Sequence, residues 1–381
     1  MGERKHIPAL DGLRGCAVLA VMCYHLGGGV QSHNPVVHLA GVATRYGFAG
    51  VQLFFVLSGF LITGILWDSK GSAFWWRNFF MRRALRIFPL YYASLLLNLI
   101  VSALSGLGWI ALSSLWIFAL YLQNFQFPGH LRELADHLSL PLAHYWSLAV
   151  EEQFYLIWPL VLMKTRTSGQ AKVCCLAVVL ISLCVDVGTG LHVLSGLDSS
   201  FLANMGGLGA GSFLALAYRA PSWPRVIVWG PAVTLGGLCG FLLTAHFMGY
   251  QAPLFHLPVF WLLFTGMLML CLRPGLLTRL MSLPWLRWVG RISYGLYVFP
   301  SLLFPLTFWL VGRLVGPAHR ELYLGLVFVV GMCVSFAAAT LSFNYFEEPI
   351  LKLKRKFPEG TGKVARAEVA QRVEASGAPF A

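Results

Sequence analysis

The chain has 381 residues, of which 57% are hydrophobic and only 11% are charged. Soluble domains carry roughly 25% charged residues, so this composition excludes an ordinary soluble domain. The formal net charge of +13 does not indicate a nucleic-acid partner, because Lys and Arg gather at the ends of apolar stretches. At those places they set the orientation of membrane spans and attract anionic lipid.

Stretches of about 20 apolar residues recur along the whole sequence, and they predict an all-α fold, a polytopic transmembrane helix bundle. A β-barrel would instead show alternation over about 10 residues per strand. Asp11, Arg14 and His25 interrupt the first stretch, so we expect a retained span and not a cleaved signal peptide. In chain order the stretches cover residues 9–28, 46–67, 88–105, 108–122, 145–164, 171–191, 202–219, 225–247, 255–272, 288–312 and 322–346.

The placement of Lys and Arg predicts the topology. If every basic cluster is cytoplasmic, residues 88–122 must make one net crossing, with one part re-entrant or interfacial, and the chain makes about ten crossings. Both termini then lie in the cytoplasm. The segment 74–86 mixes aromatic residues with arginines, which predicts an interfacial amphipathic helix before the span that follows.

The domain organisation follows from the same pattern. We expect residues 1–351 to form one membrane-embedded domain and residues 352–381 to form a basic, disordered cytoplasmic tail, too short for a further folded domain. All eight cysteines lie in apolar stretches without metal-type spacing. They are therefore interpreted as packing residues, and no bound metal or permanent cofactor is expected.

Two ionisable residues inside the first span are the main functional signal. Arg14 and His25 are eleven positions apart, which puts them on one helix face about 16 Å apart along the axis. Ionisable groups in a bilayer are costly and often mark a functional site. The functional interpretation makes His25 a general base for a hydroxyl that attacks a thioester. The alternatives are a local Asp11–Arg14 pair and an interfacial His25 that caps helix carbonyls.

A dense basic group precedes the third stretch. Arg82, Arg83 and Arg86 stand within five positions of one another, and membrane anchoring is the simplest explanation. The functional alternative is a phosphate clamp by Arg83 and Arg86, because guanidinium groups bind phosphate oxygens in bidentate fashion.

Polar residues also open the span at 145–164. Ser147, Glu151 and Tyr155 follow the spacing i, i+4, i+8 and share a helix face, and Glu152 adds a second acid. The helix dipole favours acids in a first turn, but this density favours the polar wall of a buried cavity. There a carboxylate would orient an imidazole or balance an arginine. The candidates for this polar cavity are Asp11, Ser58, Trp146, Ser147, Glu152 and Tyr155. For Ser58 and the adjacent Gly59, in the middle of a span, close helix packing is the preferred interpretation.

Taken in order, these stretches resemble acyltransferase family 3, integral membrane proteins that O-acylate sugars and related molecules. One departure stands near Pro300, where the family often has a histidine. The matching pieces are Leu10–Gly15 with ten residues between Arg14 and His25, Phe54–Phe60, Arg82–Pro89, Trp146–Tyr155, Ile292–Tyr297 and Glu347–Pro349.

The resemblance implies a ten-span bundle that uses acetyl-CoA or another acyl-CoA as cosubstrate from the cytoplasm. It implies catalysis by His25 with Arg14 as its motif partner, and a part in activity for Arg83 and Arg86 through the acyl donor. We add Glu151 as a residue that tunes the polar cavity. Direct transfer and transfer through an acyl-enzyme are both compatible with this set.

We therefore expect a membrane O-acyltransferase, in the first place an O-acetyltransferase, in the inner (plasma) membrane. Its acceptor would be a hydroxyl of an extracytoplasmic or lipid-linked polysaccharide, such as an exopolysaccharide or lipopolysaccharide. One alternative is acylation of a secreted small molecule such as a macrolide. Another is a multi-span transporter without covalent chemistry, which the absence of two matching sequence halves disfavours. A membrane sensor or scaffold is a third, and the sequence leaves the oligomeric state open.

Overall fold

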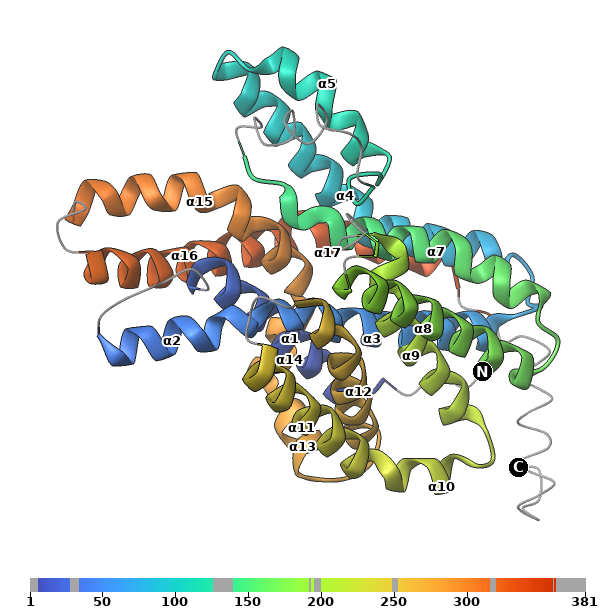
Figure 1. The fold of residues 1–381 in the computed structure, drawn as a ribbon. Helices are drawn as coiled ribbons and strands as arrows, with labels where there is room; N and C mark the ends of the chain where they lie inside the picture. The colour runs from blue at the N-terminus through green and yellow to red at the C-terminus, as the bar shows by residue number, and fades with distance from the viewer. Residues whose placement is uncertain are drawn as a thin grey trace. The chain divides into compact units, whose positions relative to one another are not determined.

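The computed structural model of the chain describes residues 6–27, 34–125, 140–191, 193–194, 200–248, 253–315, 320–358 and 360. Every regular element in these ranges is a helix (Figure 1). The prediction of an all-α fold is therefore confirmed. The predicted tail lies, from residue 361 on, outside the described residues.

The helices follow one another with short connections. Their bounds are α1 (Pro8–Gly27), α2 (Pro35–Arg45), η1 (Tyr46–Phe48), α3 (Ala49–Ser69), α4 (Trp75–Leu104), α5 (Gly108–Ala119), η2 (Ala143–Tyr145), α7 (Trp146–Lys164), α8 (Ser168–Gly190), α9 (Phe201–Arg219), α10 (Trp223–Val226), η3 (Ile227–Trp229), α11 (Gly230–Met248), α12 (Pro253–Cys271), α13 (Leu276–Met281), α14 (Pro284–Arg291), α15 (Ser293–Val315), α16 (Arg320–Ser342), η4 (Phe343–Glu347), α17 (Glu348–Lys352) and η5 (Leu353–Lys356).

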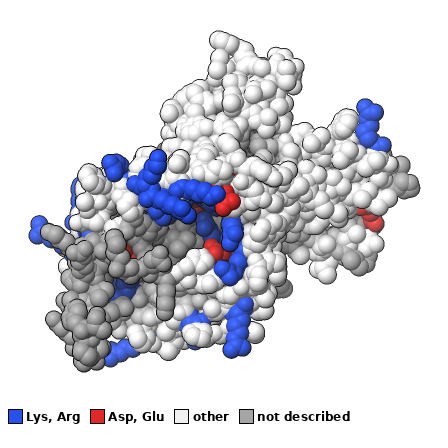
Figure 2. Space-filling model, turned by 180° about the vertical axis from the view of Figure 1, so that it is seen from behind, with Lys and Arg blue, Asp and Glu red and all other residues white. Residues whose placement is uncertain are grey.

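Eight helical segments in the described ranges are long and apolar enough to cross a membrane. The protein is therefore a multi-pass membrane protein, as its composition predicts. Large apolar side chains stand exposed on these helices, for example Leu104 on α4 and Leu180 on α8. Figure 2 shows broad areas of the visible face without charged residues. The expected ten crossings stay a prediction, which requires α7 and α12 to cross as well.

The helix α4, which follows the turn at 70–74, differs from the elements predicted for this part of the sequence. The segment expected as an interfacial helix, 74–86, is instead the first half of α4, which continues without a break through Pro89. Proline removes one helical hydrogen bond but does not always end a helix, because neighbouring groups can compensate inside a membrane protein. The sequence pattern at this point reflects a change from polar to apolar side chains within one helix, and not the end of a helix.

The helix α5 folds back along the second half of α4. The hydroxyl of Tyr91 donates to the carbonyl oxygen of Phe118 at 2.7 Å, and that of Tyr92 donates to Ala119 at 3.0 Å. With 12 residues, α5 is about 18 Å long, against roughly 30 Å for the hydrocarbon core. This length is consistent with the predicted re-entrant or interfacial part of 88–122.

The described chain forms two compact units. The first comprises Met1–Phe54, Pro89–Ala149 and Cys271–Pro349. In it α1 packs directly on α13 and α14: a Cβ added to Gly12 would lie 1.8 Å from the carbonyl oxygen of Met281, and one added to Gly290 would lie 1.9 Å from that of Asp11. The helices α15 and α16 form a hairpin in the same unit (Figure 1).

The second unit comprises Phe55–Phe88, Val150–Leu270 and Ile350–Ala381. Here α8 and α9 form a hairpin, and α3 approaches α9 so closely that a Cβ on Gly59 would lie 2.0 Å from the carbonyl oxygen of Leu208. The packing interpretation stated for Ser58-Gly59 therefore holds for the glycine.

Two cations fix the end of α3 in the second unit. Arg219 of α9 donates to both carboxylate oxygens of Asp68, at 2.6 and 2.7 Å. Lys70, in the turn after α3, donates to the carbonyl oxygens of Leu162, at 2.6 Å, and Thr165 at the end of α7. Partial burial lowers the pKa of Lys70 from its ordinary value, because it disfavours the charged ammonium.

Candidate active site

Arg14 and His25 both lie on α1, which is unbroken over its 20 residues. Both are half-buried. The carboxylate of Asp11 pairs with His6 at 2.8 Å, and the described part of the chain contains no Asp11–Arg14 ion pair. The alternative of a local pair that neutralises both charges is therefore not what the structure contains.

The ring of His25 faces other protein groups at the end of α1. Its centroid lies 5.5 Å from that of His144, 5.3 Å from that of Tyr24 and 6.3 Å from that of Phe304. The angle of 70° between the two imidazole planes places them edge to face. An imidazole can exchange a proton with a hydroxyl near neutral pH, so the chemistry of this side chain allows acid–base catalysis.

His144 lies in the short η2 turn before α7, and it is only 7% exposed. Its carbonyl oxygen accepts a hydrogen bond of 2.6 Å from the hydroxyl of Tyr297 on α15. The hydroxyls of Tyr297 and Ser147 also bond to each other. The first span, the η2 turn and α15 thus meet around one pair of imidazoles within the first unit.

Side chains of α4 and of the segment after α5 hold the turn around His144 in place. Asn98 donates to the carbonyl oxygen of Leu140 at 2.9 Å, and the hydroxyl of Tyr145 donates to Ser94 at 2.8 Å. Gln123 donates to the carbonyl oxygen of Tyr145 at 2.8 Å. These bonds matter because non-helical backbone at membrane depth must find its partners inside the protein.

A second polar cluster lies in the other unit, on α3 and α7. Ser58 donates to Glu151 at 2.6 Å, and Tyr155 donates to the other carboxylate oxygen at 3.0 Å. Ser58 and Tyr155 are also in contact at 3.5 Å. The three residues were all sequence candidates, and the structure brings them together.

Arginine reaches the same cluster from α4. The guanidinium of Arg83 lies 5.9 Å from the ring centroid of Tyr155 and within electrostatic range of Glu152. Of the two roles weighed for the carboxylates of α7, the balancing of an arginine is the one that this cluster supports. Arg86 is half-buried three residues further along α4, and Trp146 begins α7 in the first unit.

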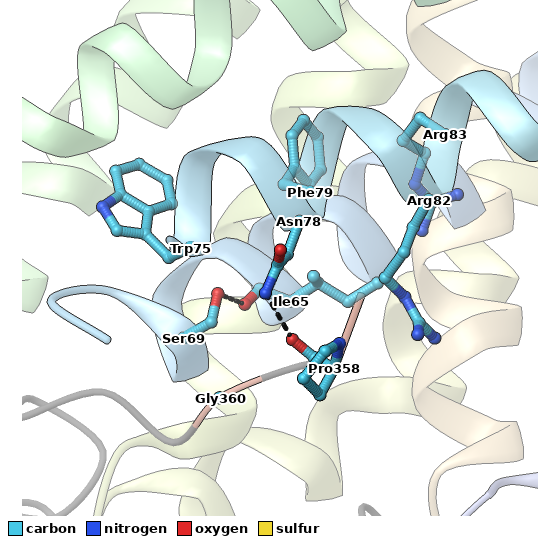
Figure 3. Close-up of a pocket in the computed structure, with 9 residues that line it drawn as sticks. All are labelled: Ile65, Ser69, Trp75, Asn78, Phe79, Arg82, Arg83, Pro358 and Gly360. Atoms are coloured by element: carbon cyan, nitrogen blue, oxygen red, sulfur yellow. Dashed lines mark hydrogen bonds between the residues drawn. The ribbon is translucent and has the colours of Figure 1, made fainter. Parts of the chain in front are cut away.

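Arg82 differs from Arg83 although the two are adjacent. It donates to the carbonyl oxygens of Lys354, at 3.2 Å, and Phe357, at 3.1 Å. The amide of Asn78 donates to the carbonyl oxygen of Pro358 at 2.9 Å. Figure 3 shows these side chains around a pocket, lined by Ile65, Ser69, Trp75, Asn78, Phe79, Arg82, Arg83, Pro358 and Gly360.

His144 and Tyr297 are not among the site residues predicted from the sequence. His144 has no helical spacing from His25, because it reaches the first span through a turn and not along a shared helix. The only available signal was its place directly before a polar helix start, in the stretch His144–Tyr155. Spacing along one helix finds neighbours on that helix and misses those that the tertiary fold supplies.

Comparison with known proteins identifies relatives over most of the chain. A family model described as an acyltransferase domain matches residues 7–342. Peptidoglycan O-acetyltransferase OatA of Listeria monocytogenes is 30% identical over 376 residues, 92% of this chain and 56% of that protein. O-acetyltransferase OatA of Staphylococcus aureus is 26% identical over 409 residues, 96% of this chain and 61% of that protein. The chain thus spans less than two thirds of the length of these relatives. No solved structure matches it.

Proposed function

Because the chain belongs to acyltransferase family 3, whose domain covers residues 7–342, we propose that it is a membrane O-acyltransferase that transfers an acyl group, in the first place acetyl, from acyl-CoA to a sugar hydroxyl. The observation that carries this proposal is the position of His25. It is a titratable group on a membrane helix whose ring faces other protein side chains, among them His144 at 5.5 Å.

The chemistry assigned to His25 is general base catalysis. The imidazole takes the proton of the acceptor hydroxyl, the oxygen attacks the thioester carbonyl, and the C–S bond breaks to release the thiol of CoA. Arg14, on the same helix, would steady negative charge on the donor or the intermediate. Transfer in one step and transfer through an acyl-enzyme remain alternatives within this proposal.

The donor side of the proposal concerns the pocket on α4. Two guanidinium groups, of Arg82 and Arg83, line it together with the amide of Asn78. Guanidinium groups suit the phosphates of acyl-CoA. Arg86, the second arginine of the proposed clamp, is not among the lining residues, so we assign Arg83 the larger part in donor binding.

The acceptor is proposed to be a carbohydrate outside the cytoplasm. Two relatives are named for O-acetyl transfer, and the one from Listeria monocytogenes is named for peptidoglycan. We therefore place peptidoglycan glycan strands first among the acceptors to test, ahead of lipopolysaccharide, exopolysaccharide and secreted small molecules. The enzyme would reside in the plasma membrane with both termini in the cytoplasm.

The test is mass spectrometry of cell-surface glycan from cells that produce the wild type, His25→Ala or His246→Ala. His246 is an exposed histidine at the end of α11 and serves as the matched control. We expect acyl groups on the glycan with wild type and control, and their loss with His25→Ala at equal membrane protein level. Equal acylation by a well-inserted His25→Ala variant would refute the base assignment.

If neither the wild type nor the control adds acyl mass to any glycan or secreted metabolite, the acyl-transfer proposal fails. Solute flux that depends on Arg14 would then favour a transporter. The three surface polysaccharides are hydrolysed and analysed separately, so that the acceptor is identified in the same experiment.

A further inference from the structure

His144 combines three properties that the chemistry assigned to His25 leaves unused. Its side chain is buried, its Nε2 has no hydrogen-bond partner among the described residues, and its ring contacts that of His25. A buried polar nitrogen without a partner costs about 1–3 kcal/mol, so its retention calls for an explanation.

Whether Nε2 of His144 donates or accepts a hydrogen bond depends on whether Nδ1 carries the hydrogen of the neutral ring. We place the hydrogen of the neutral ring on Nδ1, because Nε2 is the buried nitrogen that has no partner among the described residues. In a neutral imidazole the nitrogen that does not carry the hydrogen is an acceptor. Nε2 of His144 is therefore a buried hydrogen-bond acceptor without a donor among the described residues.

The surroundings restrict which donor that is. The titratable groups that face the ring are His25 from α1, Tyr145 from its own turn and Tyr297 from α15. The two tyrosine hydroxyls are already used, by Ser94 and by the carbonyl oxygen of His144 itself. Of the three, His25 is the one that gains a proton during the proposed reaction.

We propose that His144 is a positioning residue for acyl transfer, whose buried Nε2 accepts a hydrogen bond from the His25 imidazolium that forms when His25 takes the proton of the acceptor hydroxyl. This inference rests on the proposed function. The charge-assisted bond stabilises the protonated base where the membrane offers little water. It forms only when His25 is protonated, since catalytic hydrogen bonds are often long before the substrate is in place.

The step balances without any further reactant. The O–H bond of the acceptor breaks and its proton goes to His25, while the new C–O bond forms at the thioester carbonyl. The C–S bond breaks with its electron pair on sulfur. The imidazolium, held by His144, then returns its proton to the thiolate, so the products are the ester and free CoA thiol.

Two variants separate this role from mere packing. His144→Phe keeps a ring against His25, Tyr145 and Tyr297 but removes the acceptor nitrogen. His144→Gln removes the ring but supplies an amide oxygen as acceptor. A structural role for the ring predicts that the phenylalanine variant is the more active, and an acceptor role predicts that the glutamine variant is.

The measurement is the rate of transfer from labelled acetyl-CoA to peptidoglycan glycan strands in membranes with equal amounts of each variant, from pH 5 to pH 9. We expect His144→Phe to be at least about tenfold slower than the wild type. We also expect the acidic limb of its pH–rate profile to lie at lower pH than in the wild type. Without the acceptor, His25 is harder to protonate and is therefore a weaker base. His144→Gln should recover part of the rate.

The outcomes distinguish this inference from the function on which it rests. If the wild type transfers acetyl and His25→Ala does not, but His144→Phe matches the wild type in rate and pH profile, the role of His144 is refuted and the proposed function stands. A slower His144→Phe with an unchanged profile, not improved in His144→Gln, also refutes it and leaves a packing role. No transfer by the wild type to any acceptor refutes both.

Discussion

Ser58 donates a hydrogen bond of 2.6 Å to Glu151 across 93 residues of sequence, and so joins the middle of α3 to the start of α7. The acceptor is a carboxylate that also receives Tyr155 at 3.0 Å. Two hydroxyl donors on one carboxylate keep its charge satisfied where solvent is scarce.

Removal of the Ser58 hydroxyl should therefore destabilise the second unit. We expect Ser58→Ala to lower the free energy of unfolding by about 1.5–3 kcal/mol, the range for hydrogen bonds to charged groups. Thermal unfolding in detergent measures it. In the double variant Ser58→Ala/Glu151→Gln, the loss of unfolding free energy should be smaller than the sum of the two single losses, because both substitutions remove the same bond. The control is Ser105→Ala, since Ser105 is exposed directly after α4 and donates to the carbonyl oxygen of Val101 in that helix. Strict additivity would contradict the assignment.

The contact between α1 and α14 depends on the absence of a side chain at Gly290. We expect Gly290→Ala to destabilise the protein by about 1–3 kcal/mol through overpacking, because its Cβ would collide with the carbonyl oxygen of Asp11. Gly312→Ala on α15 is the matched control, since a Cβ there meets no atom within 4 Å. Detergent melting curves compare the two. Equal melting temperatures for the two variants would show that α1 and α14 can move apart without loss of stability.

The contacts of Arg82 predict a local effect on the segment after the last helix. Arg82→Gln should remove the bonds to Lys354 and Phe357 and expose η5 to trypsin, which cleaves after Lys and Arg. We expect faster cleavage within residues 352–356, followed by mass spectrometry of the fragments. Arg83→Gln serves as control, because the guanidinium of Arg83 lies over the ring of Tyr155 on α7. Cleavage at the same rate in both variants would mean that other contacts hold this segment.

Donor binding gives the fourth prediction. Arg83→Gln should weaken the binding of labelled acetyl-CoA to membranes by about tenfold, as expected for the loss of one charge-assisted contact to phosphate. Arg83→Lys keeps the charge but not the planar fork, and should recover only part of the affinity. Arg279→Gln, at an exposed arginine of α13, controls for net charge. Unchanged affinity in Arg83→Gln would remove this residue from the donor site.

The sequence was sufficient for those features that depend on one helix at a time. Hydropathy predicts most spans to within a few residues, and the spacing of Glu151 and Tyr155 correctly predicts that they share a face of α7. It was also sufficient to single out Ser58, although the bond to Glu151 is a tertiary contact that spacing does not predict.

What could not be predicted is set by packing between segments. The continuity of α4 through Pro89 depends on its neighbours, so the proline suggested a boundary where none exists. Arg82 and Arg83 are indistinguishable in sequence, and only the fold sends one to the segment at Lys354–Pro358 and the other to Tyr155. The approach of His144 to His25 likewise arises from a turn held by α4, for which no periodic signal exists.

The non-helical backbone from Leu140 to Tyr145 lies beside the uncharged half of α4. Asn98 of α4 and Gln123, which follows α5, donate to its carbonyl oxygens, and Ser94 of α4 accepts from the hydroxyl of Tyr145. Lipid cannot tolerate such a segment, so water or protein must border it. A bilayer thins locally around an apolar helix that is shorter than its hydrocarbon core, and α5 is such a helix. The rate of the enzyme should therefore depend on the chain length of the surrounding phospholipids, with thin bilayers favouring the approach of a hydrophilic acceptor.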